Sequence, residues 1–273
     1  MDLQKKALVT LLPHESKRLI AKGVKKILED RKVLNEHKVL ISLGTTNIYV
    51  LEELTGAPLK TREKFIAGMI NEGVQCINAK DNRLTPVLID ESGQAAHVKD
   101  LQETVKDFDS DDVFIKGANA VDNDNNVGIY MANQMGGTVS TYPLLAARGV
   151  DIITPVGREK LIPSVPKVAG KLGIKEIDYS IGKKCGMICI STSTVVSEVE
   201  AFSVLTGVGA YHVASGGVEG SEGACGFLLE GDKTQVENTI ALIKEIKQEQ
   251  PLKVEKMSCS ECDTPCYLNQ DIN

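Results

Sequence analysis

The chain has 273 residues, of which 42% are hydrophobic, only 4% are aromatic and none is tryptophan, so its core must be built mainly from aliphatic side chains. The formal net charge of −6 argues against a nucleic-acid partner, because a broadly acidic surface would not neutralise phosphates. No apolar run approaches the roughly 18 residues of a membrane span, and the apolar stretch before Pro13 is shorter than the hydrophobic region of a secretory signal. We therefore expect a cytoplasmic protein with no membrane partner, in which a disulfide framework is not formed.

The N-terminal part of the chain alternates between helix and strand patterns. Residues 14–29 carry apolar side chains at helical spacing and predict an amphipathic helix. Residues 38–56 predict a short apolar strand, a tight turn and a helix that stops at a glycine. Residues 63–92 contain two short apolar runs on either side of Asn71-Glu72-Gly73, which predict a hairpin, and then one further strand.

The same alternation continues through the middle of the chain. Residues 112–122 predict a strand that leads into a loop, residues 150–157 predict a further strand, and helices are expected at residues 138–149 and 164–173. Strands that alternate with helices predict a parallel sheet covered on both faces. We therefore expect residues 1–180 to form a three-layer, parallel-sheet α/β domain that binds a ligand.

A different order of elements begins near Lys184. The pattern predicts strand, helix, strand, strand, helix and strand, in that order, at residues 185–191, 197–207, 210–218, 224–231, 232–247 and 252–258. This is the order of a split βαβ fold. We expect a smaller ferredoxin-like α+β domain at residues 184–258, followed by a cysteine-bearing tail at residues 259–273.

Two glycine turns are candidate anion sites. The turn "LGTTN" offers Gly44, Thr45, Thr46 and Asn47, and "GGT" offers Gly136, Gly137 and Thr138. Each turn stands at the start of a predicted helix, where unpaired backbone N–H groups and the helix dipole attract anions. Because ligands of open α/β sheets bind at the carboxyl ends of strands, we expect the two turns to share one anionic ligand. The alternative is that each is only a tight turn that caps its helix.

These turns resemble those of a known superfamily. "LGTTN" resembles a Leu-Gly-Thr-Gly-Ser-Thr turn of ribose-5-phosphate isomerases, and "KGANAVDNDNN" resembles their Gly-Ala-Asp-Glu-Val-Asp stretch, which also precedes a glycine run. Methylthioribose-phosphate isomerases and some CoA-transferases have related loops. The resemblance covers about residues 38–165 and lies at the level of the ribose-phosphate isomerase/CoA-transferase superfamily. It implies a phosphorylated or CoA-linked metabolite and a small ferredoxin-like subdomain.

The loop after the predicted strand at Val113–Ile115 differs from that of the isomerases. Asn119 stands where they have their first loop Asp, whereas Asp122 matches the second. The segment after the glycines lacks the Glu that these enzymes use as a base, and asparagine cannot replace it. We expect Gly117, Asn119 and Asn126 to bind the ligand, and Asp122 to be an acid/base candidate.

Four further charged residues are candidates. Arg158 and Lys160 follow a predicted strand and could pair with an anion, or form only a solvated cluster. Glu219 and Glu222 lie in a glycine-rich loop that is longer than a hairpin requires. Either glutamate could be a base, a metal ligand or a nucleophile, or the loop could be merely a flexible connection.

The tail contains Cys259, Cys262 and Cys266 at the spacing C-x-x-C-x-x-x-C. Thiolates two residues apart can reach one soft metal, so zinc or an iron–sulfur cluster is chemically reasonable. The fourth ligand could be another cysteine (Cys185, Cys189 or Cys225), a residue of a partner chain or a substrate. The alternative is a disordered tail with redox-active thiols, or a chance cluster.

Three functions remain open from the sequence. The first is a small-molecule enzyme of isomerase or transferase type that acts on a phosphorylated or CoA-linked metabolite, with Asp122 and Glu219 or Glu222 as acid/base candidates. The second is a metal or iron–sulfur protein that uses the three tail cysteines. The third is a module that senses a ligand without turnover. In each case the expected partner is a small anionic metabolite, and a homo-oligomer is left open.

Overall fold

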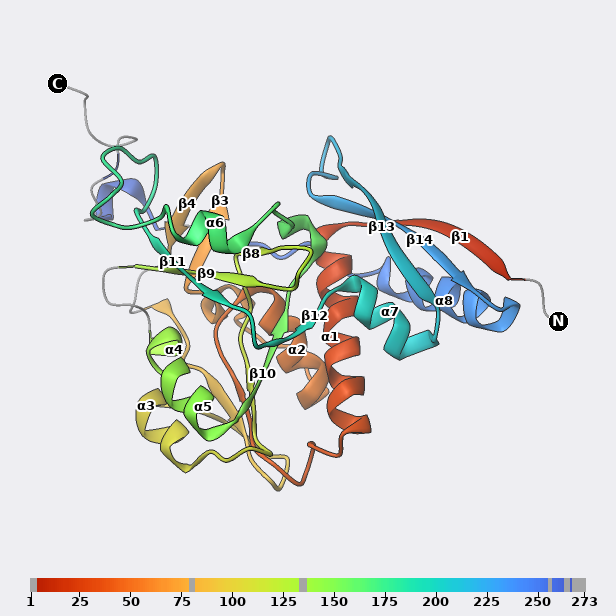
Figure 1. Ribbon diagram of the computed structural model, residues 1–273, viewed down its shortest axis with the longest axis horizontal. Helices are drawn as coiled ribbons and strands as arrows, with labels where there is room; N and C mark the ends of the chain where they lie inside the picture. The colour runs from red at the N-terminus through yellow and green to blue at the C-terminus, as the bar shows by residue number, and fades with distance from the viewer. Residues whose placement is uncertain (1–3, 79–81, 133–136, 255–256, 263–265, 267–273) are drawn as a thin grey trace.

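The computed structural model describes residues 4–78, 82–132, 137–254, 257–262 and 266. It is a mixed α/β structure whose main sheet contains both parallel and antiparallel strands (Figure 1). The order in this sheet is β12 (Thr194–Val196), β10 (Asp151–Pro155), β7 (Val113–Ile115), β2 (Val39–Ile41), β5 (Val87–Ile89) and β6 (Ala95–His97). The first four strands are parallel, and β5 and β6 are antiparallel to their neighbours. A parallel sheet was predicted, so the sheet differs from the prediction at this edge.

Helices pack on both faces of the main sheet because its central strands have apolar residues at successive positions. Val39 and Ile41 of β2 join the core formed with α1 (Pro13–Asp30) and α2 (Thr45–Thr55). Leu40 points to the opposite face and joins the core of α5 (Tyr142–Arg148). This alternation follows the period of two in a strand. The short helices α3 (Leu101–Thr104) and α4 (Gly137–Ser140) lie near α5 (Figure 1).

The strand, turn and helix predicted for residues 38–56 are confirmed. β2 ends at Ile41, α2 begins at Thr45, and the helix ends at Gly56, whose φ of 67° lies in the left-handed region that favours glycine. The hairpin predicted around Asn71 is also confirmed, as β3 (Gly68–Asn71) and β4 (Val74–Ile77).

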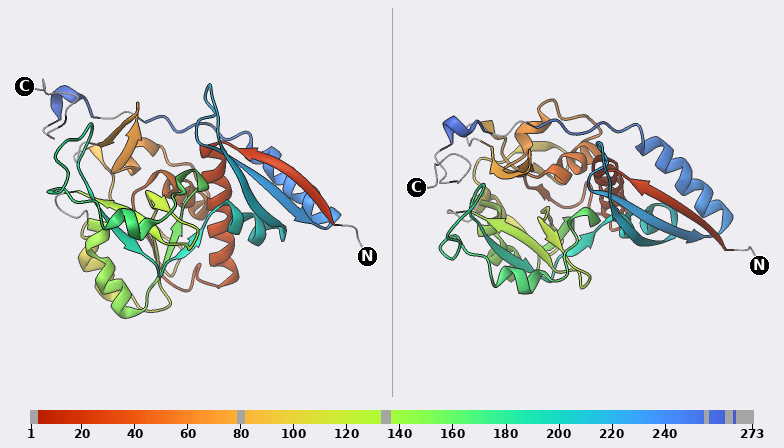
Figure 2. Two further views of the ribbon diagram at one scale, coloured as in Figure 1. Left: turned by 45° about the horizontal axis from the view of Figure 1, so that its top comes forward. Right: turned by 90° about the horizontal axis from the view of Figure 1, so that it is seen from above.

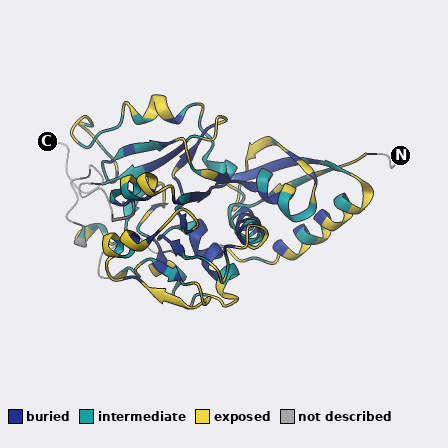
Figure 3. Cartoon of the chain, turned by 60° about the horizontal axis from the view of Figure 1, so that its bottom comes forward, coloured by how far each residue is buried: buried dark blue, intermediate teal, exposed yellow. Residues whose placement is uncertain are grey.

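A second sheet extends from the main body toward the N-terminus (Figures 1 and 2). It is antiparallel, with the order β1 (Lys5–Leu11), β14 (Ala224–Gly231) and β13 (Gly209–Gly216). Helices α7 (Glu198–Thr206) and α8 (Lys233–Ile246) share its core. Figure 3 shows α8 with buried residues on one side and exposed residues on the other, as its buried Val236, Thr239, Ile243 and Ile246 require.

This arrangement departs from the ferredoxin-like order expected for residues 184–258. The first expected strand, β11 (Gly186–Ile190), pairs with β9 (Val127–Met131), which also pairs with β8 (Ala120–Val121) beside α6 (Val165–Ala169). β12 joins the main sheet. The described residues within 252–258 form no strand, because Leu252 and Val254 pack on the large core and β1 takes the free edge of β14.

Short 3-10 segments lie at Arg62–Phe65 (η1), Val105–Asp107 (η3), Arg158–Lys160 (η4) and Cys259–Glu261 (η5). None of the helices in the described part of the chain is both long enough and apolar enough to span a bilayer.

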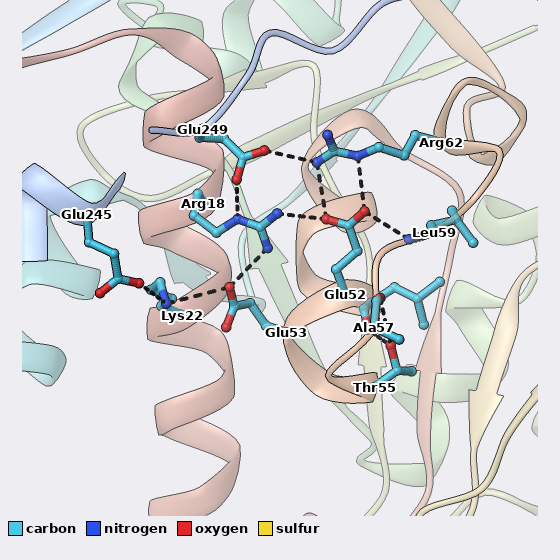
Figure 4. Close-up of polar contacts among 11 residues, drawn as sticks. Arg18, Lys22, Glu52, Glu53, Thr55, Ala57, Leu59, Arg62, Glu245 and Glu249 are labelled. Atoms are coloured by element: carbon cyan, nitrogen blue, oxygen red, sulfur yellow. Dashed lines mark hydrogen bonds and ion pairs between the residues drawn. The ribbon is translucent and has the colours of Figure 1, made fainter. Parts of the chain in front are cut away.

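An ion network fastens the segment after α8 to the first two helices (Figure 4). Arg18 of α1 reaches Glu52 of α2 and Glu249 at 2.7 Å each. Arg62 reaches Glu52 at 3.0 Å and Glu249 at 3.4 Å. Both guanidinium groups lie over the buried Tyr49 ring, at 4.9 Å and 4.5 Å from its centroid. The network therefore fixes where the chain leaves α8 and starts toward its C-terminus.

Candidate functional site

A cavity of about 430 Å³ lies at the carboxyl ends of β2 and β7. Residues 43–46, which follow β2, and residues 116–119, which follow β7, form one side of it. The other walls come from the β3–β4 hairpin, from β9 and from residues 183–185. The carboxyl ends of parallel strands are the usual ligand site of an open α/β sheet.

The lining of this cavity is strongly basic although the chain as a whole is acidic. Six basic side chains line it, namely Arg83, Lys99, Lys116, Lys160, Lys183 and Lys184. No aspartate or glutamate occurs among its described lining residues. Such a concentration of positive charge in a concave site favours an anionic ligand.

Lys116 follows β7 and Lys160 lies at the end of η4, and both are partly buried. The backbone N–H of Lys116 donates to Ile153 O at 3.0 Å, which fixes the residue where β7 meets β10. Lys116 Nζ donates to Gly117 O at 3.1 Å, and Lys160 Nζ donates to Ala118 O at 2.9 Å. Within the described ranges, no carboxylate lies at ion-pair distance from either amine.

Both amines have lowered pKa values. Burial, together with the nearby Lys160 charge, lowers the pKa of Lys116 from 10.5 to about 8. Burial also lowers the pKa of Lys160. In both cases burial removes hydration that stabilises the ammonium form, and at Lys160 the charges of Glu159 and Glu198 offset part of this effect. A bound anion would supply further counter-charge.

The turn "LGTTN" lies at the cavity as predicted, although Asn47 does not line it. Gly44 is the N-cap of α2, and Gly44, Thr45 and Thr46 all line the cavity. No side chain caps this end of α2, so its first-turn N–H groups and dipole add positive potential. The buried Asn47 instead donates through Nδ2 to Ser42 O at 2.8 Å and to Ile115 O at 3.4 Å, which ties the ends of β2 and β7 together.

The loop after β7 divides into two parts. Gly117 and Asn119 line the cavity, and the amide oxygen of Asn119 accepts from the Tyr130 N–H at 3.0 Å. Asp122 and Asn126 are not among the lining residues. The carboxylate of the buried Asp122 accepts N–H groups of Asn126 and Val165. Burial alone would raise the pKa of Asp122, but these donors lower it, which is characteristic of a turn-stabilising carboxylate.

The second glycine turn is only partly described. Gly136 lies outside the described residues, Gly137 begins α4, and nothing is described of the Gly137 and Thr138 side chains. Val139 of the same short helix lines the cavity. One residue of α4 therefore reaches the cavity, and the expectation that the two glycine turns share one ligand stays a prediction.

The other predicted acid/base and anion-binding residues are not brought together at the cavity. Arg158 Nε donates to Ser197 Oγ at 3.0 Å, and the Arg158 backbone N–H donates to Glu198 Oε2 at 2.9 Å. Glu219 and Glu222 are exposed in the loop that joins β13 to β14, which projects away from the main sheet (Figure 1). Of this group, only Lys160 lines the cavity.

Sequence reasoning missed the cation nearest to the strand ends. Lys116 directly follows the apolar run Val113–Ile115 and precedes Gly117, so its position at a strand end was readable from the sequence. The sequence gives no indication that Arg83 and Lys183, which belong to distant segments, line the same cavity.

The cysteines gather at a second, much smaller hollow next to the cavity. Cys259, Cys262 and Cys266 line it together with Cys76 of β4. The Gly182 N–H donates to Cys266 Sγ at 2.9 Å. In the described part of the chain, no three His, Cys, Asp or Glu side chains are placed to hold a single metal ion.

Comparison with known proteins gave no relative. No protein-family model matches the chain, and searches of curated proteins and of solved structures found no match.

Proposed function

We propose that the protein is a small-molecule enzyme of isomerase or transferase type that binds a phosphorylated metabolite in the cavity at the ends of β2 and β7. The observation that carries this proposal is the basic lining: six cations surround about 430 Å³ without a carboxylate among the described lining residues. A cavity of this volume falls within the ~300–1,000 Å³ that is usual for small-molecule sites. The resemblance of "LGTTN" and "KGANAVD" to the ribose-phosphate isomerase/CoA-transferase superfamily points to the same class of ligand.

A phosphate group suits this lining for two physical reasons. Its oxygens can accept charge-assisted hydrogen bonds from Lys116 and Lys160, which have no described carboxylate at ion-pair distance. The uncapped first turn of α2 provides backbone N–H groups and the positive end of the helix dipole. An uncharged sugar would add no counter-charge to these partly buried ammonium groups and should bind much more weakly.

Lys116 is the acid/base candidate of this proposal. With a pKa of about 8, part of its population is neutral near physiological pH. Where Lys160 and the first turn of α2 hold the phosphate, the neutral Lys116 amine can accept a proton from a carbon next to a carbonyl, or attack the carbonyl itself. This role replaces the Glu base that the segment after the glycines lacks, and it does not require Asp122, Glu219 or Glu222, which are not among the described lining residues.

The test is thermal unfolding of the full chain, followed by circular dichroism, with a panel of ligands. Inorganic phosphate and ribose 5-phosphate should raise the melting temperature, whereas ribose should not. A ligand at 100 times its Kd stabilises the folded state by ~2.7 kcal/mol. Coenzyme A in the same panel tests the CoA-linked alternative.

A matched pair of variants assigns the effect to the cavity. Lys116→Met should remove the phosphate-induced shift, and Lys167→Met, which changes an exposed lysine of α6, should preserve it. Equal shifts with ribose and ribose 5-phosphate, or no shift with any phosphate, would overturn the proposal.

A further inference from the structure

Four cysteines from two distant parts of the chain face one small hollow. Cys76 belongs to β4, whereas Cys259, Cys262 and Cys266 belong to the C-terminal tail. β4 and the tail are separated by most of the chain. Their cysteines therefore lie close together only because of the fold. Cysteines 185, 189 and 225, which the sequence offered as candidates for a fourth ligand, do not line this hollow.

Contacts made by residues 249–254 position the tail next to the β3–β4 hairpin. Glu249 is held by Arg18 and Arg62, and Leu252 and Val254 then pack on the large core. The Asn71 side chain in the β3–β4 hairpin donates to Val254 O at 3.1 Å. Figure 2 shows this run from α8 to the β3–β4 hairpin from two sides.

Backbone and side-chain hydrogen bonds also hold residues 182–183 against Gln75 in the wall of the hollow. The Lys183 N–H donates to Gln75 O at 2.8 Å, and the Gln75 side chain donates to Lys183 O at 3.1 Å. Gly182 has a φ of 97°, and a Cβ there would lie 2.5 Å from Gln75 O, so only glycine permits this approach. The Gly182 N–H that results is the one that donates to Cys266 Sγ. Backbone donors to sulfur are a regular means of stabilising thiolates around iron–sulfur clusters.

A zinc ion and an iron–sulfur cluster make different demands on a set of four thiolates. A zinc ion needs its ligands to converge on one point, with each sulfur at ~2.3 Å. The described cysteines surround a hollow, and no three of them are placed to hold one ion. A cluster contains several iron ions, each of which takes its own thiolate, so four thiolates around a hollow fit a cluster better than a single ion.

We propose that Cys76, Cys259, Cys262 and Cys266 bind an iron–sulfur cluster, with Cys76 as the ligand from the body of the fold. Gln75, Cys76, Ile77 and Lys183 line both the hollow and the large cavity. The cluster would therefore lie in the wall of the cavity. This inference is independent of the proposed function, because it rests on cysteines and not on the basic lining.

The test uses the full chain, purified without oxygen and reconstituted with ferrous iron and sulfide. The expected result is bound iron, acid-labile sulfide and a broad visible absorption. Cys76→Ser and Cys259→Ser should each lose most of the bound iron. Cys189→Ser and Cys225→Ser should keep it, since Cys189 lies on β11 and Cys225 in the core of the second sheet. Far-UV circular dichroism confirms that each variant is folded.

Three results would overturn this inference. The first is that reconstituted protein binds no iron, and the second is that it binds zinc in preference to a cluster. The third is that Cys185→Ser loses the cluster while Cys76→Ser keeps it, because Cys185 is the nearby alternative, held by Gln75 Nε2 at 3.2 Å. A phosphate-induced thermal shift measured on Cys259→Ser, whose changed residue does not line the large cavity, reports on the proposed function separately.

Discussion

Replacement of Lys116 by methionine should make the ligand-free protein more stable. The wild-type amine is poorly solvated, lies near a second lysine and has no described carboxylate at ion-pair distance. Methionine keeps much of the side-chain volume and removes the charge. A residue that costs stability while it lines a cavity is the expected signature of a binding group, since function is often retained at the expense of stability.

The size of the effect follows from the pKa of Lys116. A fall from 10.5 to about 8 corresponds to ~3 kcal/mol at pH 7, because one pKa unit equals about 1.36 kcal/mol. The hydrogen bond from Lys116 Nζ to Gly117 O is lost, at a cost of ~1 kcal/mol. We therefore expect a net gain of about 2 kcal/mol.

The lowered pKa of Lys116 also predicts how the stability difference between the variant and the wild type changes with pH. The folded-state pKa of Lys116 lies below the unfolded value, so between about pH 8 and pH 10.5 the unfolded chain holds a proton that the folded chain has lost. The penalty is complete below pH 8 and disappears as the pH rises through 10.5. The difference in stability between the Lys116→Met variant and the wild type should therefore be largest at neutral pH and shrink above pH 8.

Urea unfolding at a series of pH values measures this difference directly. Lys167→Met serves as the control and should follow the wild type within about 0.5 kcal/mol, as exposed substitutions usually do. A Lys116→Met variant that is less stable than the wild type at pH 7, or a difference that does not change with pH, would refute the reasoning.

Three further predictions concern the same site and the ion network. At pH 8, phosphate binding should be accompanied by uptake of about half a proton, because the bound anion raises the pKa of Lys116. Calorimetry in buffers of different ionisation enthalpy measures this proton uptake. Binding without proton uptake would contradict the prediction. Pyridoxal 5′-phosphate, an aldehyde with a phosphate group, should form an imine that borohydride traps on Lys116, and mass spectrometry that finds only exposed lysines labelled would argue against this assignment. Glu52→Gln should cost about 1.5–3 kcal/mol in urea unfolding, because Arg18 and Arg62 each lose one charged partner but keep Glu249, whereas the exposed Glu29→Gln should cost under ~0.5 kcal/mol; equal losses would show that the network contributes little.

The sequence predicted the local units of the main sheet well. The apolar runs of β2, β7 and β10 and the glycine after α2 are short-range signals, and all appear in the structure. The sheet partners were harder to predict because pairing is non-local. The alternation of Ala7, Val9 and Leu11 fits an edge strand on β14, but nothing near it in the sequence identifies β14 as its partner.

The site shows the same division. Gly44 and Gly117 were predicted from their place at strand ends, and both line the cavity. The basic character of the cavity could not be predicted, because Arg83 and Lys183 reach it from separate segments whose positions depend on the whole fold. Cys76 is a parallel case, since a lone cysteine in a hairpin carries no motif until the tail is placed beside it.

The central claim is that the cavity binds a phosphate group through its cations. Isothermal titration of ribose 5-phosphate into the full chain tests it most directly, with ribose as the reference ligand. We predict saturable binding of ribose 5-phosphate alone, weakened by added salt and reduced at least tenfold, or ~1.4 kcal/mol, in Lys116→Met but not in Lys167→Met. Binding of equal strength to both variants, or no binding of the phosphorylated sugar, would contradict it.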